Sequence, residues 1–160
     1  MTPLIPRQLR IVLTAVVLAL ALVPSAAATT TLSQSERSLL AAVNDVRGEH
    51  GLRPLSVDPI LTRAARAHST ALLRQNVFTH GSFAARIARH GARGTAFGEN
   101  LAWGTGPFAS AESIVRSWLD SPGHRANLLR PGWSRVGIGT RVGTFLGHDG
   151  ATVVTADFAG

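Results

Sequence analysis

The chain of 160 residues contains no cysteine. This absence excludes disulfide bonds, catalysis by a thiol and zinc sites built from cysteine. A domain without such cross-links depends for its stability on a hydrophobic core or on a bound ligand. A single domain of this length is large enough to bury a core of that kind.

Long hydrophobic runs are almost absent, since the chain has only one, over residues 11–23. This run is too short for a comfortable transmembrane helix, which needs about 20 residues. Arg7 and Arg10 precede it and the small residues of 24–28 follow it, a pattern typical of a secretory signal peptide cleaved after Ala28. We therefore expect a secreted, extracellular protein with no transmembrane anchor after cleavage, divided into a signal peptide (1–28), a short linker (29–36) and one domain (37–160).

Lysine is also absent, because all sixteen basic residues are arginine, against nine acidic residues and a formal net charge of +7. Aromatic residues make up only 6% of the chain and no dense basic run occurs. We therefore predict no binding to nucleic acid. A secreted protein of this charge can meet anionic cell-wall polymers or membrane surfaces. A merely soluble, arginine-rich surface is the alternative explanation.

Helix signals dominate the first part of the chain. Ser33 and Glu36 form a capping box before an apolar pattern of helical period that ends at Gly51. Asp58 followed by Pro59 is typical of the start of a second helix. Further helical segments are expected over residues 83–89, 109–119 and 125–129.

The pattern changes from residue 136 onward. Apolar residues alternate with glycine over 136–140, which predicts a strand. Residues 147–150 are expected to form a tight turn, and 151–158 the next strand. Helices followed by antiparallel strands indicate an α+β fold rather than repeated βαβ units.

A sharp break follows the helix predicted over 109–119. Ser121-Pro122-Gly123 cannot continue a regular helix. His124 comes next, at the point where a new helical turn can begin. Its ring can therefore be aimed into a cleft.

Three of the ionisable residues that stand beside glycine are candidates for a common site: His80, Glu99 and His124. Glycine lets the backbone approach closely, so that its neighbour can point into a cleft. Two imidazoles and a carboxylate suit a divalent metal such as zinc, and they equally suit general acid–base chemistry. The spacing of these residues leaves two alternatives to a shared site open. His80 and His124 could fix turns by bonding to backbone carbonyls, and Glu99 could form an ion pair with Arg125. His68 is expected to be a structural residue on a helix face.

Seven short motifs occur in order along residues 39–158, and together they closely resemble the CAP superfamily of cysteine-rich secretory proteins, venom antigens and plant pathogenesis-related proteins. The resemblance is to its compact bacterial, secreted branch. The motifs are Asn44-Asp45-Val46-Arg47 with Gly51-Leu52-Arg53-Pro54-Leu55, Ala67-His68-Ser69, Phe78-Thr79-His80, Gly98-Glu99-Asn100-Leu101-Ala102, Trp118 with Ser121-Pro122-Gly123-His124-Arg125-Ala126-Asn127-Leu128-Leu129, Val136-Gly137-Ile138-Gly139, and Asp157-Phe158.

The resemblance implies an α-β-α sandwich with a central antiparallel sheet. It also implies that His80, Glu99 and His124 line one cleft, with His80 and His124 as the residues that would bind a metal. The chain departs from the family pattern at Ser121, where many relatives have a second glutamate, and this weakens a four-residue acid–base device. We expect Asn100, Ser121 and Arg125 to support the cleft.

The leading functional hypothesis is a non-enzymatic extracellular binding module whose cleft can hold zinc or another divalent metal. A metal-dependent or acid–base hydrolase with protease-like activity is the first alternative, and a lipid-binding or cell-wall-binding protein is the second. The expected partner is an extracellular lipid, cell-wall polymer or peptide, bound by a monomer. Ser121 lies close enough to His124 in the sequence to suggest a Ser–His–Glu catalytic triad. However, the Gly-x-Ser-x-Gly motif that presents a nucleophilic serine does not surround it.

Overall fold

The computed structural model describes residues 30–160. The expected signal peptide therefore lies outside the described residues. The first helix, α1 (Gln34–Glu49), begins within the expected linker, and Ser33 and Glu36 form the predicted capping box at its start. Leu32 is already buried, so the packed part of the chain begins before residue 37.

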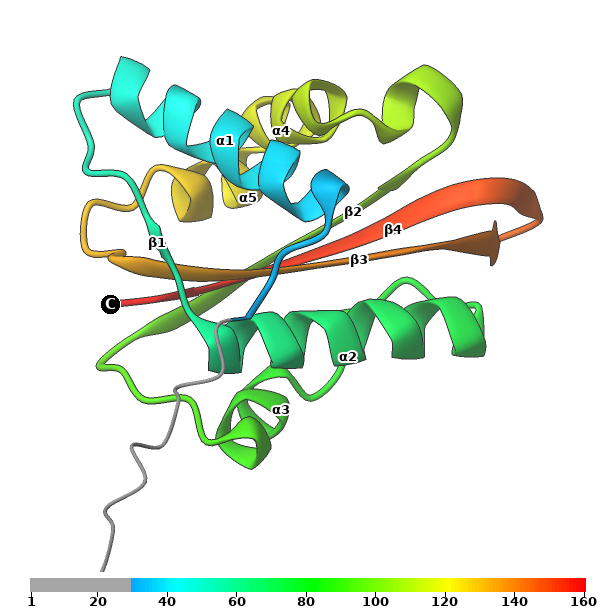
Figure 1. The fold of residues 1–160 in the computed structure, drawn as a ribbon, viewed down its shortest axis with the longest axis horizontal. Helices are drawn as coiled ribbons and strands as arrows, with labels where there is room; N and C mark the ends of the chain where they lie inside the picture. The colour runs from blue at the N-terminus through cyan, green and yellow to red at the C-terminus, as the bar shows by residue number, and fades with distance from the viewer. Residues whose placement is uncertain (1–29) are drawn as a thin grey trace, which may run out of the picture.

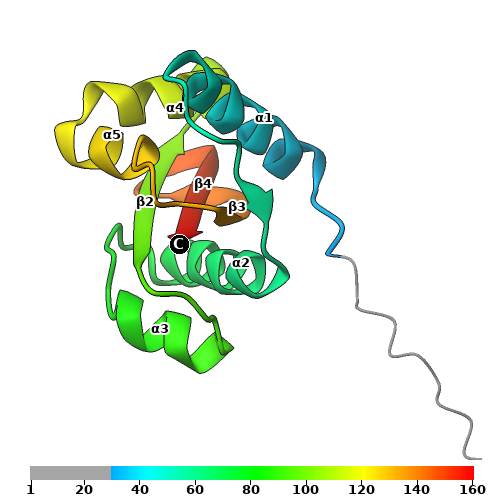
Figure 2. The same cartoon turned by 90° about the vertical axis from the view of Figure 1, so that its left-hand side faces the viewer.

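The molecule is a three-layer α-β-α sandwich, as the resemblance implies (Figures 1 and 2). A four-stranded sheet in the order β1-β3-β4-β2 forms the middle layer. Helices α2 and α3 cover one face of the sheet, and α1, α4 and α5 cover the other. The remaining elements are β1 (Ser56–Val57), α2 (Pro59–Gln75), α3 (Phe83–His90), β2 (Phe97–Gly104), a 3-10 turn η1 (Gly106–Ala109), α4 (Ala111–Asp120), α5 (Pro122–Leu128), β3 (Arg135–Phe145) and β4 (His148–Ala159).

The sheet is antiparallel except for its short edge strand. Strand β4 pairs antiparallel with both β2 and β3, whereas the two residues of β1 pair parallel with β3. The turn predicted over 147–150 is wrong. The chain reverses at Leu146 and Gly147, and the next residue, His148, already pairs with Phe145 in the sheet. Both turn residues have positive φ, 50° and 84°, as a two-residue hairpin of this twist requires.

Two glycines of β3 let helix α2 lie directly against the sheet. A Cβ atom on Gly137 would lie 2.0 Å from the backbone carbon of Leu61, and one on Gly139 would lie 2.3 Å from the backbone nitrogen of Arg66. Neither distance is compatible with a side chain. The glycines that alternate in the sequence therefore mark the contact line between β3 and α2.

The Ser-Pro-Gly break is a junction between two consecutive helices. Helix α4 ends at Asp120, and Pro122 is the first residue of α5, a position where proline loses no hydrogen bond. Helix α5 therefore begins three residues earlier than the predicted 125–129 segment. His124 lies in its first turn.

Trp118 and Trp133 are both buried in the core, at 1% and 2% exposure. The indole N–H of Trp118 donates to the carbonyl of Leu101, 2.9 Å away, and so ties α4 to β2. Strand β2 also carries Glu99, so this contact helps to fix the position of Glu99. Among residues 30–160, no helix is both long and apolar enough to cross a membrane.

Candidate functional site

The centre of the site is a hydrogen bond between an exposed histidine and a buried glutamate. His80 lies in the loop between α2 and α3, and its Nδ1 is 2.7 Å from Oε1 of Glu99 on β2. The side chain of His80 is 55% exposed, whereas that of Glu99 is 2% exposed. A carboxylate only accepts hydrogen bonds, so the neutral imidazole of His80 is the tautomer with its hydrogen on Nδ1 and its free lone pair on Nε2.

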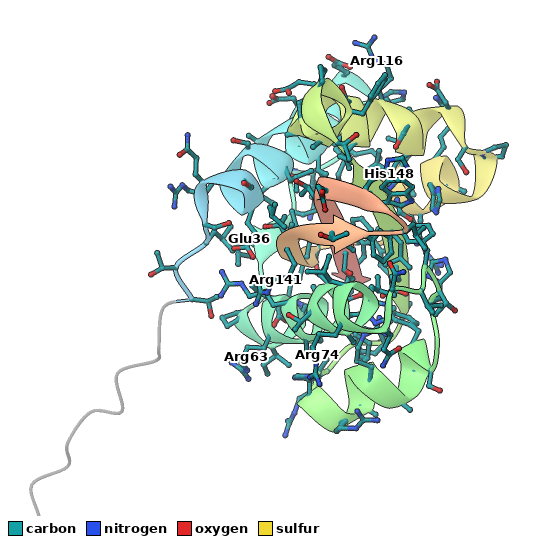
Figure 3. All side chains as sticks on the ribbon, turned by 90° about the vertical axis from the view of Figure 1, so that its right-hand side faces the viewer. Glu36, Arg63, Arg74, Arg116, Arg141 and His148 are labelled. Atoms are coloured by element: carbon teal, nitrogen blue, oxygen red, sulfur yellow. The ribbon has the colours of Figure 1, made fainter. Side chains whose placement is uncertain are left out.

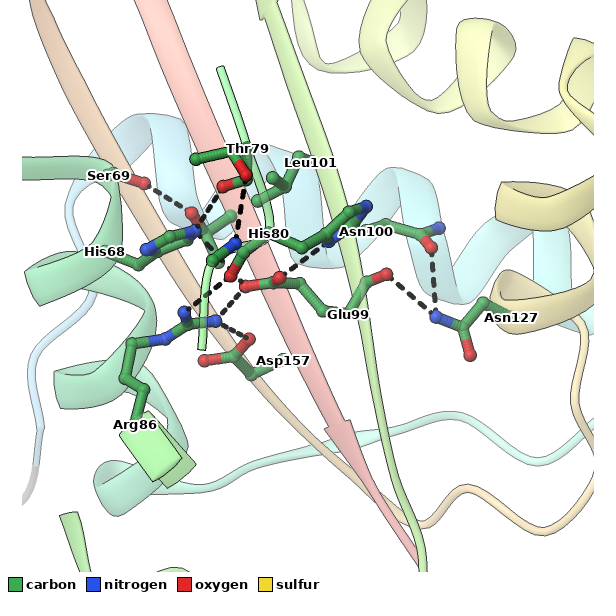
Figure 4. A network of polar contacts seen from close by, with 12 residues as sticks. His68, Ser69, Thr79, His80, Arg86, Glu99, Asn100, Leu101, Asn127 and Asp157 are labelled. Atoms are coloured by element: carbon green, nitrogen blue, oxygen red, sulfur yellow. Dashed lines mark hydrogen bonds and ion pairs between the residues drawn. The ribbon is translucent and has the colours of Figure 1, made fainter. Parts of the chain in front are cut away.

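Arg86, on α3, holds both partners of this hydrogen bond. Its Nη2 donates to Oε2 of Glu99, and its Nη1 donates to the backbone oxygen of His80, 3.3 Å away. Figure 4 shows the guanidinium reaching the carboxylate and the loop at the same time. The same Nη2 lies 3.6 Å from Oδ1 of Asp157. The ion pair considered between Glu99 and Arg125 is therefore replaced by a pair with Arg86.

Asp157 lies beside Glu99 because the two residues are paired across β4 and β2. Its side chain is fully buried, and neither of its oxygens has a hydrogen-bond partner among the described residues. Burial, and then the negative charge of Glu99, raise the pKa of Asp157 well above its usual value. Burial also raises the pKa of Glu99, while Arg86 opposes that rise. The pKa of Glu99 reaches about 7, and its negative charge raises that of Asp157 further, so we assign the proton of the pair to Asp157 and the ionised form to Glu99 above that pH.

His68 fixes the loop that carries His80. Its Nε2 lies 3.0 Å from the backbone oxygen of Thr79 and 3.8 Å from Oε2 of Glu99. Burial, followed by the positive charge of Arg86, lowers the pKa of His68 to about 4. The ring is therefore neutral near pH 7 and donates from Nε2 to the Thr79 carbonyl. This is the structural role expected for His68, in a place next to the site.

His124 reaches the site from the opposite helical layer. Burial, and then the charge of His80, lower the pKa of His124, so the two imidazoles lie within electrostatic reach of each other. The amide of Asn100 donates to the backbone oxygen of His124 at 3.0 Å. Asn127 donates to the backbone oxygen of Glu99 at 2.9 Å. These amides join β2 to α5 and so hold the two imidazoles on neighbouring elements.

The three residues expected to support the cleft differ in what they do. Asn100 is fully buried and contacts the helix of His124, as described above. The side chain of Ser121 makes no capping hydrogen bond. Arg125 is exposed, and its side chain has no hydrogen bond within the described part of the chain.

The principal residues that the sequence did not reveal are Arg86 and Asp157. Asp157 belongs to one of the seven motifs, but nothing in the sequence around Asp157 and Phe158 indicates that this carboxylate is buried. Arg86 lies on a short helix between Phe83 and Ile87, where an arginine is expected to be solvated. Only the three-dimensional structure shows that it turns inward.

The arrangement provides few ligands for a metal ion. Within residues 30–160, no three or more His, Asp or Glu side chains are placed to hold a metal together. Both oxygens of Glu99 are occupied, one by His80 and the other by Arg86. The imidazoles of His80 and His124 are therefore the candidate protein ligands, one fewer than the three typical of open zinc sites.

The family model for the cysteine-rich secretory protein family, CAP, matches residues 40–158. The chain belongs to this family. Its similarity extends to the uncharacterized protein YkwD of Bacillus subtilis (32% identity, 70% of this chain and 44% of that protein) and to pathogenesis-related protein 1C of Nicotiana tabacum (29% identity, 58% and 48%). The matched region thus spans less than half the length of these relatives.

Solved structures share the fold at low sequence identity. An extracellular protein containing a SCP domain from Bacillus anthracis superimposes with a TM-score of 0.66 and 23% identity, covering 82% of this chain and 45% of that one. An outer surface protein of Borrelia burgdorferi gives a TM-score of 0.65 and 22% identity, covering 79% and 92%. These similarities support the α+β fold.

Proposed function

We propose that this CAP domain is a secreted, extracellular binding module that contacts its ligand through His80 and His124. One observation carries the proposal: the imidazole of His80 is more than half exposed, yet a buried carboxylate fixes its orientation. Ordering an exposed side chain costs conformational entropy, which the hydrogen bond to Glu99 offsets, so the imidazole can bind a ligand without a further entropic cost. The signal-peptide pattern, and relatives described as extracellular or outer-surface proteins, support the location.

The imidazoles of His80 and His124 suit a ligand, such as a metal ion, that accepts a lone pair from an imidazole nitrogen. A hydrogen bond from Nδ1 to a carboxylate makes Nε2 a stronger donor of its lone pair, which is the arrangement that metal-binding histidines commonly use. His80 and His124 are the residues that would hold a divalent ion, with Glu99 behind His80. With only two protein ligands, we expect such an ion to exchange readily and to leave positions open for an extracellular ligand.

A hydrolase is less well supported by the geometry. No Ser or Thr hydroxyl is hydrogen-bonded to the ring of His80 or His124 within residues 30–160, and the chain has no cysteine. A nucleophile activated by either ring is thus lacking in the arrangement described.

Calorimetric titration with Zn²⁺ tests the proposed pair. We expect the wild type to bind zinc at one site, and the double variant His80→Ala/His124→Ala to bind at least about tenfold more weakly. The variant His50→Ala/His148→Ala removes two exposed imidazoles elsewhere and serves as the control, with affinity unchanged. Equal affinity in the two double variants, or no binding to the wild type, would remove the metal from the proposal.

A panel of peptide and ester substrates separates binding from catalysis. We expect no turnover above that of the His124→Ala variant. Turnover by the wild type that is lost in His124→Ala would replace the binding module with a hydrolase using the same site.

A further inference from the structure

One layer of the sandwich is free of acidic residues. The segment from residue 59 to 98 contains six arginines and three histidines but no aspartate or glutamate. This segment comprises α2, α3 and the loops next to them, which together cover one face of the sheet. The helices of the opposite layer carry both signs of charge, with acids such as Asp45, Glu112 and Asp120.

Four of the six arginines of this layer are exposed and have no ion pair within the described residues. The other two are used internally, since Arg66 pairs with Glu36 and Arg86 with Glu99. We call the remaining cationic surface the α2–α3 basic face. Its cations are Arg63, Arg74, Arg89 and Arg93, and the imidazole of His90 lies among them.

These side chains gather on one side of the molecule. Arg63 and Arg74 are eleven residues apart in α2, which is three helical turns, so they share one side of the helix roughly 16 Å apart. Figure 3 shows both at the edge opposite Arg116. Helix α3 packs against α2. Arg63 and Arg89 lie near enough to His90 for their charges to add to the effect of burial in lowering its pKa.

We propose that the α2–α3 basic face binds a linear, phosphate-bearing polymer outside the cell. Like charges gathered without acids repel one another, and an anionic partner removes that cost. Arginine matches phosphate particularly well, because its planar guanidinium offers paired donors. Arg63 and Arg74, about 16 Å apart, are too far from each other to contact a single phosphate and suit a repeating chain of phosphates. This surface is separate from the His80 site and does not depend on its proposed role.

A polymer fits this surface better than a lipid bilayer does. Peripheral membrane binding usually adds large apolar side chains that insert between lipids. Helices α2 and α3 carry none of the exposed large hydrophobic side chains of the described residues. Val77 and Phe78 lie in the loop after α2 that leads to His80, and Phe108, Val142 and Leu146 lie in other segments. The exposed apolar residues of α3 are small alanines, Ala84, Ala85 and Ala88.

Binding of labelled long-chain inorganic polyphosphate, followed by fluorescence anisotropy, tests the proposal. About four phosphate contacts predict a loss of affinity on the order of 50-fold between about 50 and 200 mM salt. We expect Arg63→Ser/Arg89→Ser to weaken binding by at least about tenfold. The control Arg53→Ser/Arg116→Ser removes the same charge from other exposed positions and is expected to change affinity by less than about threefold. Thermal unfolding of each variant shows that it is folded.

Several results would overturn the proposal. Equal weakening in both double variants would mean that only net charge matters. Absence of polyphosphate binding, or binding confined to phosphatidylglycerol vesicles, would also contradict it. The His80→Ala/His124→Ala variant is expected to keep its polyphosphate affinity, so that failure at one site is distinguishable from failure at the other.

Discussion

At the scale of single residues, Arg86 links the loop of His80 to the carboxylate behind it. Replacing it with methionine would leave Glu99 buried without its cation, with Asp157 beside it. We expect Arg86→Met to lower the free energy of unfolding by about 3 kcal/mol near pH 8. The loss should be smaller near pH 5, where the carboxyl can be neutralised by a proton.

Denaturant unfolding at the two pH values measures this effect. Arg86→Lys keeps the charge but not the paired donors, so its loss should be intermediate. A loss of Arg86→Met below about 0.5 kcal/mol at both pH values would show that the ion pair is not formed as described.

The raised pKa of Asp157 predicts that the protein loses stability as the pH rises. Because its folded-state pKa is raised, its contribution to stability is fully present below the usual pKa of aspartate and is lost as the pH rises toward the folded-state value. Asp157→Asn carries no such proton, so its melting temperature should fall less between pH 6 and 9 than that of the wild type. Asp120→Asn, an exposed acid of α4, is the control and should follow the wild type. Parallel curves for Asp157→Asn and the wild type would contradict the assigned protonated state.

At the scale of elements, glycine in β3 is required by the space available and not by an unusual backbone angle. The Cβ of an alanine at Gly139 would meet the backbone of Arg66 at 2.3 Å and that of Ala65 at 2.4 Å. Helix α2 would have to move away from the sheet, so we expect Gly139→Ala to destabilise the protein by about 3 kcal/mol. Gly123→Ala, in α5, meets no atom within 4 Å and should be neutral or slightly stabilising. Similar unfolding midpoints for the two variants would contradict the close contact.

Helix starts could be predicted because their signals are local. The capping box at Ser33 and the Asp58-Pro59 pair both begin helices where expected. Strand β2 could not be recognised, because four successive residues, Glu99 to Ala102, are buried and no polar–apolar alternation remains. The hairpin turn was placed too late, because its sequence does not reveal that Leu146 takes a positive φ.

At the scale of the whole molecule, the three-layer architecture brings together residues from segments far apart in the chain. His80 comes from a loop beside one helical layer, Glu99 from the sheet and His124 from the other layer. The family resemblance anticipated the layers, and it implied that these three residues meet. Their functional role stays a proposal. The inward turn of Arg86 could not be predicted, since it depends on α3 packing against the edge of the sheet.

The same architecture separates two surfaces of different chemistry. The layer of α2 and α3 presents unpaired arginines, while the His80 site opens beside the loop between these helices. The two proposals together assign an anionic polymer to one surface and a second ligand to the other.

Imidazole NMR of ¹⁵N-labelled protein tests the central claim most directly. In the wild type we predict that the hydrogen of neutral His80 resides on Nδ1, facing Glu99, and that added Zn²⁺ shifts the His80 and His124 signals together while those of His50 and His148 stay in place. A hydrogen on Nε2 of His80, or a shift of one site histidine without the other, would contradict the proposal that these two imidazoles form one ligand site.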